Sequence, residues 1–187
     1  MVKIATPISR KQIREFANKI RKSVNLEDEY YFPIIQFIEL VLPRIDPEFE
    51  YEIVEKEELP DGVYALTYPD QKKIVIRRDV YEGVCDDYGR ARFTVAHELF
   101  HYLFHDTKNI GFARADEAGP AYVDPEWQAN TFAGELLVPI HLIGGLSIDE
   151  IVEKCQVSKQ CASIQMKYYK ELKSFNIKKE LSANLVQ

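Results

Sequence analysis

Three of the four histidines in the sequence lie in one short stretch, "FTVAHELFHYLFH", at intervals of four residues. In an α-helix, positions four apart lie on the same face, about 6 Å apart along the axis. His97 and His101 can therefore present ring nitrogens to one metal ion, each at a distance of about 2 Å. Glu98 lies about 100° around the helix from His97, where its carboxylate reaches a metal-bound water rather than the metal. This HExxH arrangement supplies two ligands and a general base, as metallopeptidases require.

The same stretch could instead be a buried amphipathic helix whose histidines only hydrogen-bond locally. In that interpretation the residues that pack in the core are Phe93, Ala96, Phe100, Leu103 and Phe104. We favour the metal site because two buried histidines beside a glutamate are costly without partners. His105 lies about 12 Å along the axis from His97, which is too far for the two to share an ion. We expect His105 to cap the helix C-terminus, where a partly positive imidazole suits the helix dipole.

The third ligand must come from another part of the chain. The downstream candidates are Asp106, Asp116, Glu117, Asp124, Glu126, Glu135 and His141. We favour Glu126, because it lies in the first turn of a predicted helix, "DPEWQANTFAGELLVP", and a catalytic site needs a ligand on a rigid element. Asn130 lies one turn further on the same face and can hydrogen-bond a ligating histidine. Glu135 is rotated by about 180° from Glu126 and faces another way.

In the first half of the chain, the sequence pattern predicts two helices followed by strands. Residues 9–24 form an amphipathic pattern in which Ser9 and Gln12 make a capping box, and a second helix starts at Pro33 and ends at Pro43. We expect the basic face of the first helix to be solvated rather than to bind nucleic acid. Three segments then favour β-structure, with a turn at "PDQ", as a hairpin or a three-stranded meander. They are "FEYEIVEKEEL", "GVYALTY" and "KKIVIRR".

The second half is predicted to be mainly helical. The histidine helix begins near Arg90, the segment 107–123 is irregular, and a helix capped by Asp124 runs to Val138. Two short helices, "SIDEIVEKC" and "KQCASIQMKYYKELK", follow. We therefore predict an α+β domain over residues 1–140 and a small helical subdomain over residues 141–187.

Composition excludes several classes of protein. The net charge of −6 gives no general attraction to nucleic acid or to anionic membranes. The sequence contains no apolar run long enough to span a bilayer and no recognisable signal peptide. Its three cysteines are scattered without a CxxC motif, which fits a reduced protein. We expect a cytoplasmic location.

Two blocks together resemble the ImmA/IrrE family of zinc metallopeptidases. They are "RARFTVAHELFHYLFH" and "EWQANTFAGELLVP", which occur in the family's order and span residues 90–139. The resemblance implies a zincin-like fold in which a small β-meander or hairpin packs on the HExxH helix. It also implies that His97, His101 and Glu126 bind one zinc ion and that Glu98 is the catalytic base. Phe100 departs from the pattern, because the family usually has glycine there, and this puts catalytic efficiency and substrate fit in question.

The resemblance further implies a substrate, since family members commonly cleave or inactivate a helix-turn-helix repressor and so switch on stress or mobile-element genes. Two other functions stay open: a weakly catalytic protein that sequesters such a regulator, and a DNA-binding regulator with structural zinc. The C-terminal helical pair itself resembles a helix-turn-helix, but its second helix offers no arginine, so we expect no direct DNA binding. Two histidines and a carboxylate also suit iron or manganese. The sequence leaves the oxyanion stabiliser open among four residues, Tyr102, Tyr122, Arg92 and His141.

Overall fold

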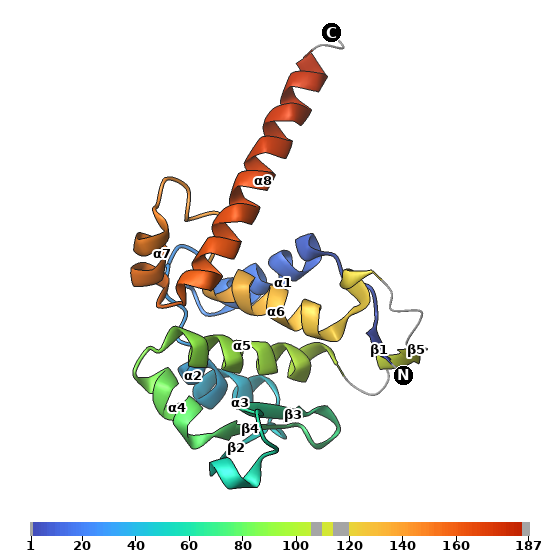
Figure 1. Ribbon diagram of the computed structural model, residues 1–187, viewed down its shortest axis with the longest axis vertical. Helices are drawn as coiled ribbons and strands as arrows, with labels where there is room; N and C mark the ends of the chain where they lie inside the picture. Colours follow the sequence, from blue (N-terminus) through green and yellow to red (C-terminus); the bar gives the residue numbers. More distant parts are fainter. Residues whose placement is uncertain (1, 106–109, 114–119, 185–187) are drawn as a thin grey trace.

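The helix that carries the HExxH motif lies in the middle of the fold. In the computed structural model, which describes residues 2–105, 110–113 and 120–184, this helix is α5 (Gly89–Phe104). One side of α5 contacts a three-stranded sheet, and the other side contacts α6 (Pro125–Leu137), on which α1 (Arg10–Ser23) packs (Figure 1). The fold is therefore a mixed α+β arrangement in which the motif lies between a sheet and a helical layer.

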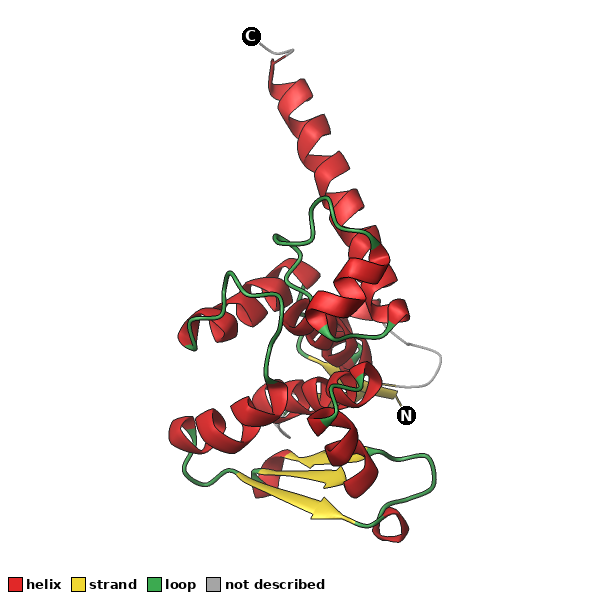
Figure 2. Cartoon of the chain, turned by 90° about the vertical axis from the view of Figure 1, so that its left-hand side faces the viewer, coloured by secondary structure: helices red, strands yellow, loops and turns green. Residues whose placement is uncertain are grey.

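The three-stranded sheet, which Figure 2 shows in yellow at the bottom of the view, consists of β2 (Glu50–Val54), β3 (Ala65–Tyr68) and β4 (Lys73–Arg77). The strand order is β2-β4-β3. β3 and β4 form the expected antiparallel hairpin around the turn Pro69–Gln71. The alternative of a three-stranded meander is wrong, because β2 pairs with β4 in parallel. Residues 74–76 are all buried, as in a central strand with both faces covered. β3 is consequently an edge strand.

A second, two-stranded sheet joins the N-terminus to the segment after α5. β1 (Val2–Ala5) pairs with β5 (Ile110–Ala113) in antiparallel register. This segment was expected to be irregular, and the prediction is wrong at β5 because the pairing partner lies far away in the sequence. The ligand candidates Asp106, Asp116 and Glu117 lie outside the described residues.

The helix predicted to end at Pro43 continues beyond it. It consists of α2 (Ile34–Gln36), a π-helical turn over Phe37–Val41, and α3 (Leu42–Ile45). After the wide turn a new α-helical segment starts at Leu42, so Pro43 lies in a first helical turn, where a missing N–H and a fixed φ are tolerated. A further helix, α4 (Arg78–Cys85), directly follows β4 and was not predicted. The remaining short helical turns are Lys56–Glu58 and Ala121–Val123.

The expectation of a solvated basic face on α1 holds for its lysines, which are exposed, but is wrong for its three arginines. The predicted capping box at the start of α1 is present. Arg21 is fully buried and donates to the backbone oxygen of Leu136 at 2.6 Å. Arg10 and Arg14 both pair with the buried carboxylate of Glu135 on α6, each at 2.8 Å. These contacts tie α1 to α6, and the sequence could not reveal them because the partners are more than a hundred residues apart.

Of the two C-terminal helices, the first agrees with the prediction and the second is longer than predicted. α7 (Ile148–Cys155) is short and carries the predicted capping box, but α8 (Lys159–Asn184) extends over 26 residues and projects from the body (Figure 1). Its sequence contains no glycine or proline that would end it earlier. A Cβ added at Gly89 would lie 2.5 Å from the backbone of Val157 and of Ser158, so the α7–α8 turn packs directly on the start of α5. No helix among the described residues is long and apolar enough to cross a membrane.

Candidate metal centre

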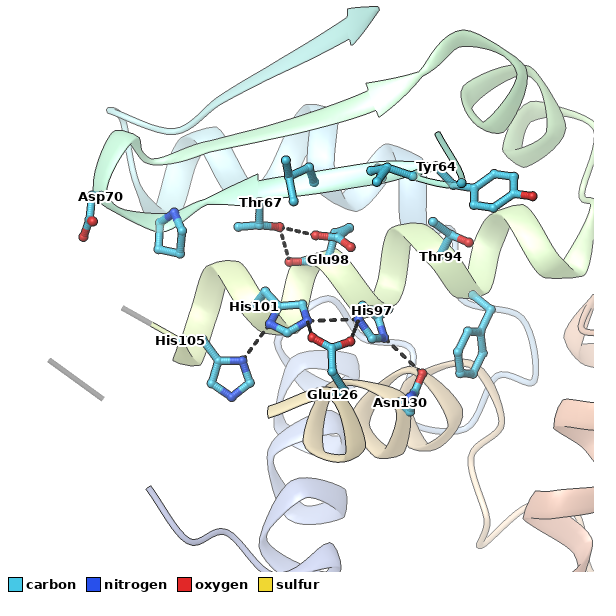
Figure 3. Close-up of a pocket in the computed structure, with 16 residues that line it drawn as sticks. Tyr64, Thr67, Asp70, Thr94, His97, Glu98, His101, His105, Glu126 and Asn130 are labelled. Carbon is cyan, nitrogen blue, oxygen red and sulfur yellow. Dashed lines mark hydrogen bonds and ion pairs between the residues drawn. The ribbon is translucent and has the colours of Figure 1, made fainter. Parts of the chain in front are cut away.

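His97 and His101 on α5 face Glu126 on α6, and the donor atoms of the three side chains converge (Figure 3). The two Nε2 atoms lie 2.9 Å apart, and the carboxylate oxygens of Glu126 lie 3.2 Å from His97 Nε2 and 3.5 Å from His101 Nε2. Two donors that each lie about 2.0–2.1 Å from a tetrahedral zinc ion are separated by about 3.3 Å. The geometry of the three donors therefore fits one zinc ion with a fourth position left for water.

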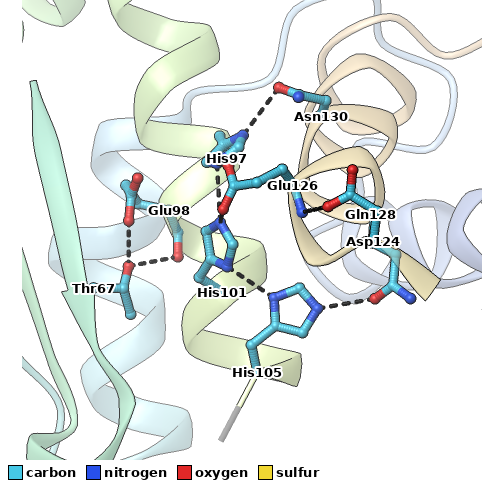
Figure 4. A network of polar contacts seen from close by, with 9 residues as sticks. All are labelled: Thr67, His97, Glu98, His101, His105, Asp124, Glu126, Gln128 and Asn130. Atoms are coloured by element: carbon cyan, nitrogen blue, oxygen red, sulfur yellow. Dashed lines mark hydrogen bonds and ion pairs between the residues drawn. The ribbon is translucent and has the colours of Figure 1, made fainter. Parts of the chain in front are cut away.

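The tautomer of His101 follows from a chain of hydrogen bonds (Figure 4). The Gln128 amide nitrogen donates to two backbone oxygens, so its Oε1 faces His105 as an acceptor, 2.9 Å from Nε2. His105, when neutral, then carries its proton on Nε2 and accepts at Nδ1. His101 Nδ1 lies 2.8 Å from that atom and must donate to it. The Nε2 lone pair of His101 is thereby directed at the metal position.

Asn130 fixes the tautomer of His97 in the same way. Its Oδ1 lies 3.1 Å from Nδ1 of His97, which donates and leaves Nε2 as the lone-pair nitrogen. Two bare nitrogens at 2.9 Å repel each other unless a cation lies between them. Burial lowers the pKa of His97, but Glu126 and Glu98 outweigh burial and raise that pKa overall. The donor set therefore favours positive charge at this point.

Glu98 lies on the opposite side of α5 from α6, beneath the edge strand β3. The hydroxyl of Thr67 lies 2.7 Å from Oε2 of Glu98 and 3.0 Å from the backbone oxygen of the same residue. Burial raises the pKa of the Glu98 carboxyl, although the hydrogen bond from Thr67 opposes this shift. A carboxylate whose pKa is raised from its ordinary value toward neutrality is better suited to accept a proton in catalysis.

A cleft of about 830 Å³ connects these groups. It is lined by β3 and the loop before it on one side and by α5 and α6 on the other, so that His97, Glu98, His101 and Glu126 all border one space (Figure 3). Because β3 is an edge strand, the cleft is flanked by backbone able to pair with an extended peptide.

Several candidates from the sequence lie elsewhere. Glu135 is buried against two arginines, and Asp124 caps α6 by accepting from the backbone N–H of Glu126 at 2.9 Å. His141 Nε2 donates to the backbone oxygen of Glu27 at 2.9 Å. The described residues that line the cleft include none of the four oxyanion candidates, which were Tyr102, Tyr122, Arg92 and His141.

The structure differs from the prediction for His105 and brings two further residues to the site. His105 does lie at the C-terminal cap of α5, but its ring is buried and burial lowers its pKa, so the expected partly positive imidazole is wrong. The two further residues are Gln128, which contacts His105, and Thr67, which contacts Glu98. The one available signal was the position of Gln128 between Glu126 and Asn130 on the same helix.

Phe100 lies in the core and not in the cleft. Its side chain is fully buried, stacks on Phe104 with ring centroids 4.7 Å apart, and packs at a tilt against Phe132 with ring centroids 4.9 Å apart. Its edge also contacts the ring of His105 at 5.2 Å. The departure from the family's glycine therefore fills the space between α5 and α6 and leaves the described wall of the cleft unchanged.

The sequence matches the model of one known protein family. A model of the IrrE N-terminal-like domain, Peptidase_M78, matches residues 53–164, well over half of the sequence. The chain belongs to this family. The match confirms the resemblance to ImmA/IrrE peptidases and contains all the candidate site residues. It also extends past residue 140 into α7 and α8, while the division at that residue stays a prediction.

Among solved structures, a Mycobacterium tuberculosis transcriptional regulator is similar in fold, with a TM-score of 0.54 and 18% sequence identity. The alignment covers 81% of this chain but 45% of that protein, so the chain spans less than half of the regulator's length. No protein of curated function matches the chain. At this identity, the likeness to the M. tuberculosis protein concerns the fold alone.

Proposed function

We propose that this member of the Peptidase_M78 family is a zinc-dependent endopeptidase. The observation that carries the proposal is the convergence of His97, His101 and Glu126 beside the buried carboxylate of Glu98, in a cleft flanked by an edge strand. A zinc ion held by the three donors would supply Lewis acidity at the scissile carbonyl. A structural zinc is less consistent with this site, because such sites are closed by four protein ligands and no described cysteine belongs to the cluster.

The roles of the other side chains follow from their positions. Glu98 accepts a proton from the attacking water at its carboxylate and passes it to the nitrogen of the leaving amine. Thr67 holds this carboxylate in place at 2.7 Å. Asn130 and His105 keep the two histidine rings oriented with Nε2 toward the ligand position. An extended substrate segment pairs with the free edge of β3 above these groups.

We further propose that the substrate is a helix-turn-helix transcriptional repressor. Its cleavage would derepress stress or mobile-element genes. Support for this choice comes from the family resemblance. The alternative is a protein that binds and sequesters the regulator with little cleavage. The position of Phe100 in the core removes the main reason for that alternative, since its ring does not enter the cleft.

The test is incubation of the zinc-loaded protein with purified helix-turn-helix repressors encoded near its gene, followed by mass spectrometry of the products. We expect one repressor to be cleaved at a defined bond by the wild type and by Glu153→Gln, which changes an exposed glutamate on α7. Glu98→Gln should bind that repressor without cleaving it. Binding without cleavage by the wild type would instead identify a sequestering protein.

A further inference from the structure

A second cavity of about 790 Å³ opens beside the metal cleft, between α5, α6 and α8. The two cavities share three lining residues, Phe93, Thr94 and Asn130. Asn130 also holds His97. The second cavity therefore adjoins the metal cleft, at the end of the cleft where Tyr64 and Thr94 lie, opposite His105 (Figure 3). A ligand that extends past His97 in this direction reaches it.

The lining of this second cavity is positively charged, although the whole chain is acidic. The charged side chains among its described lining residues are Arg10 and Arg90, and no carboxylate lines it. Arg10 is held by Glu135, which a second arginine, Arg14, also pairs with. The Arg90 guanidinium lies 5.1 Å from the ring centroid of Tyr64, and no carboxylate of the described residues pairs with it. The charge of Arg90 is thus available to an anionic ligand.

The walls around these arginines suit a polypeptide. Trp127 and Tyr168 offer aromatic surface, and Ile164 is 46% exposed there. The close approach of α8 to α6 at Gly134 closes one side of the cavity, since a Cβ at that position would collide with the amide of Gln165. Aromatic and aliphatic surface combined with a cation fits a peptide that carries apolar and acidic side chains.

Helix geometry sets the distance between Arg90 and the reacting bond. Arg90 precedes His97 by seven residues on α5, which corresponds to about 10 Å along the axis. An extended peptide advances by about 3.3 Å per residue. A substrate side chain beside Arg90 therefore belongs to a residue about three positions from the scissile bond.

We propose that the second cavity binds the flank of the same extended substrate segment, and that Arg90 selects an acidic side chain about three residues from the cleaved bond. Arg90 is a specificity-determining residue in this account and takes no part in bond cleavage. The inference rests on the proposed peptidase function, but its test measures binding and does not require turnover.

Trp127 is the single tryptophan of the chain and lines the second cavity, so its fluorescence reports occupancy. The probes are tryptophan-free synthetic ten-residue peptides with neutral, β-branched sequences. Each peptide carries a single Asp, and the set places this Asp at each position in turn. A matched peptide has Asn at the same position. We titrate them into zinc-loaded Glu98→Gln. We expect Asp at one position to tighten binding about threefold to fivefold over Asn, as for a partly exposed ion pair.

Adding Arg90→Gln to the Glu98→Gln protein should abolish this preference. Adding Arg44→Gln, which removes an exposed arginine that lines neither cavity, should leave it intact. Equal affinity for Asp and Asn peptides, or a preference that survives Arg90→Gln, would overturn the inference. If the Arg90-dependent preference is found while the wild type cleaves none of the peptides or repressors, the peptidase proposal fails and the binding site stands. Cleavage by the wild type without any acidic preference would support the peptidase proposal and overturn the inference about Arg90.

Discussion

Nδ1 of His101 lies 2.8 Å from Nδ1 of His105, so a buried histidine outside the donor set fixes the ring of a proposed ligand. His105 is itself held by Gln128 on α6 at 2.9 Å. The site therefore depends on the packing of α5 against α6 as well as on the HExxH spacing. Outer partners of this kind orient a ligand and increase its basicity.

Loss of this partner should weaken metal binding. We expect His105→Ala to lower zinc affinity by about 10–100-fold, measured by competition with a chromophoric chelator. The control is His141→Ala, because His141 is exposed and bonds only a backbone oxygen of Glu27 in the described contacts. Equal zinc affinity in the two folded variants would show that His105 does not position His101.

Phe100 should contribute to stability rather than to the cleft. Because its ring is fully buried among aromatic residues, Phe100→Ala should lower the free energy of unfolding by about 3–5 kcal/mol. Phe175→Ala is the matched control, since Phe175 is 65% exposed, and should change stability by no more than about 0.5 kcal/mol. Urea denaturation measures both. A similar small change in the two variants would mean that the α5–α6 interface tolerates a cavity at residue 100.

The candidate site also illustrates how much of a structure can be predicted from the sequence. The spacing of His97, His101, Glu126 and Asn130 follows helical periodicity, so their shared faces could be predicted from local pattern alone. The lowered pKa of His105 could not be predicted, because the burial that causes it depends on the packing of α6, a separate helix, against α5. The parallel pairing of β2 with β4 and the pairing of β1 with β5 were missed for the same reason, since strand partners are set by distant segments.

Asp46 makes part of the stability dependent on pH. Hydrogen bonds from Tyr102, at 2.8 Å, and from Lys72, at 3.0 Å, hold the pKa of the Asp46 carboxyl below its ordinary value. A carboxyl whose folded-state pKa is depressed stabilises the fold above its unfolded pKa of about 3.9, and this contribution is lost as the pH falls through the folded value.

Asp46→Asn should therefore destabilise the protein at neutral pH, and the difference from wild type should shrink as the pH falls below about 4. Urea denaturation over a pH series measures this difference. Asp28→Asn, at an exposed aspartate with no side-chain hydrogen bond among the described contacts, should show little effect at any pH. A difference in the free energy of unfolding between the wild type and Asp46→Asn that stays constant down to the lowest pH would contradict this account.

The metal content of the purified protein is the most direct test of the central claim, that His97, His101 and Glu126 form one zinc site. Inductively coupled plasma mass spectrometry should find about one zinc per chain in the wild type and in the exposed control Glu153→Ala, with little iron or manganese. Glu126→Ala should lose most of this zinc. Zinc retained fully in Glu126→Ala would show that another carboxylate completes the site. A wild type that takes up no zinc even when the metal is supplied would contradict the peptidase account altogether.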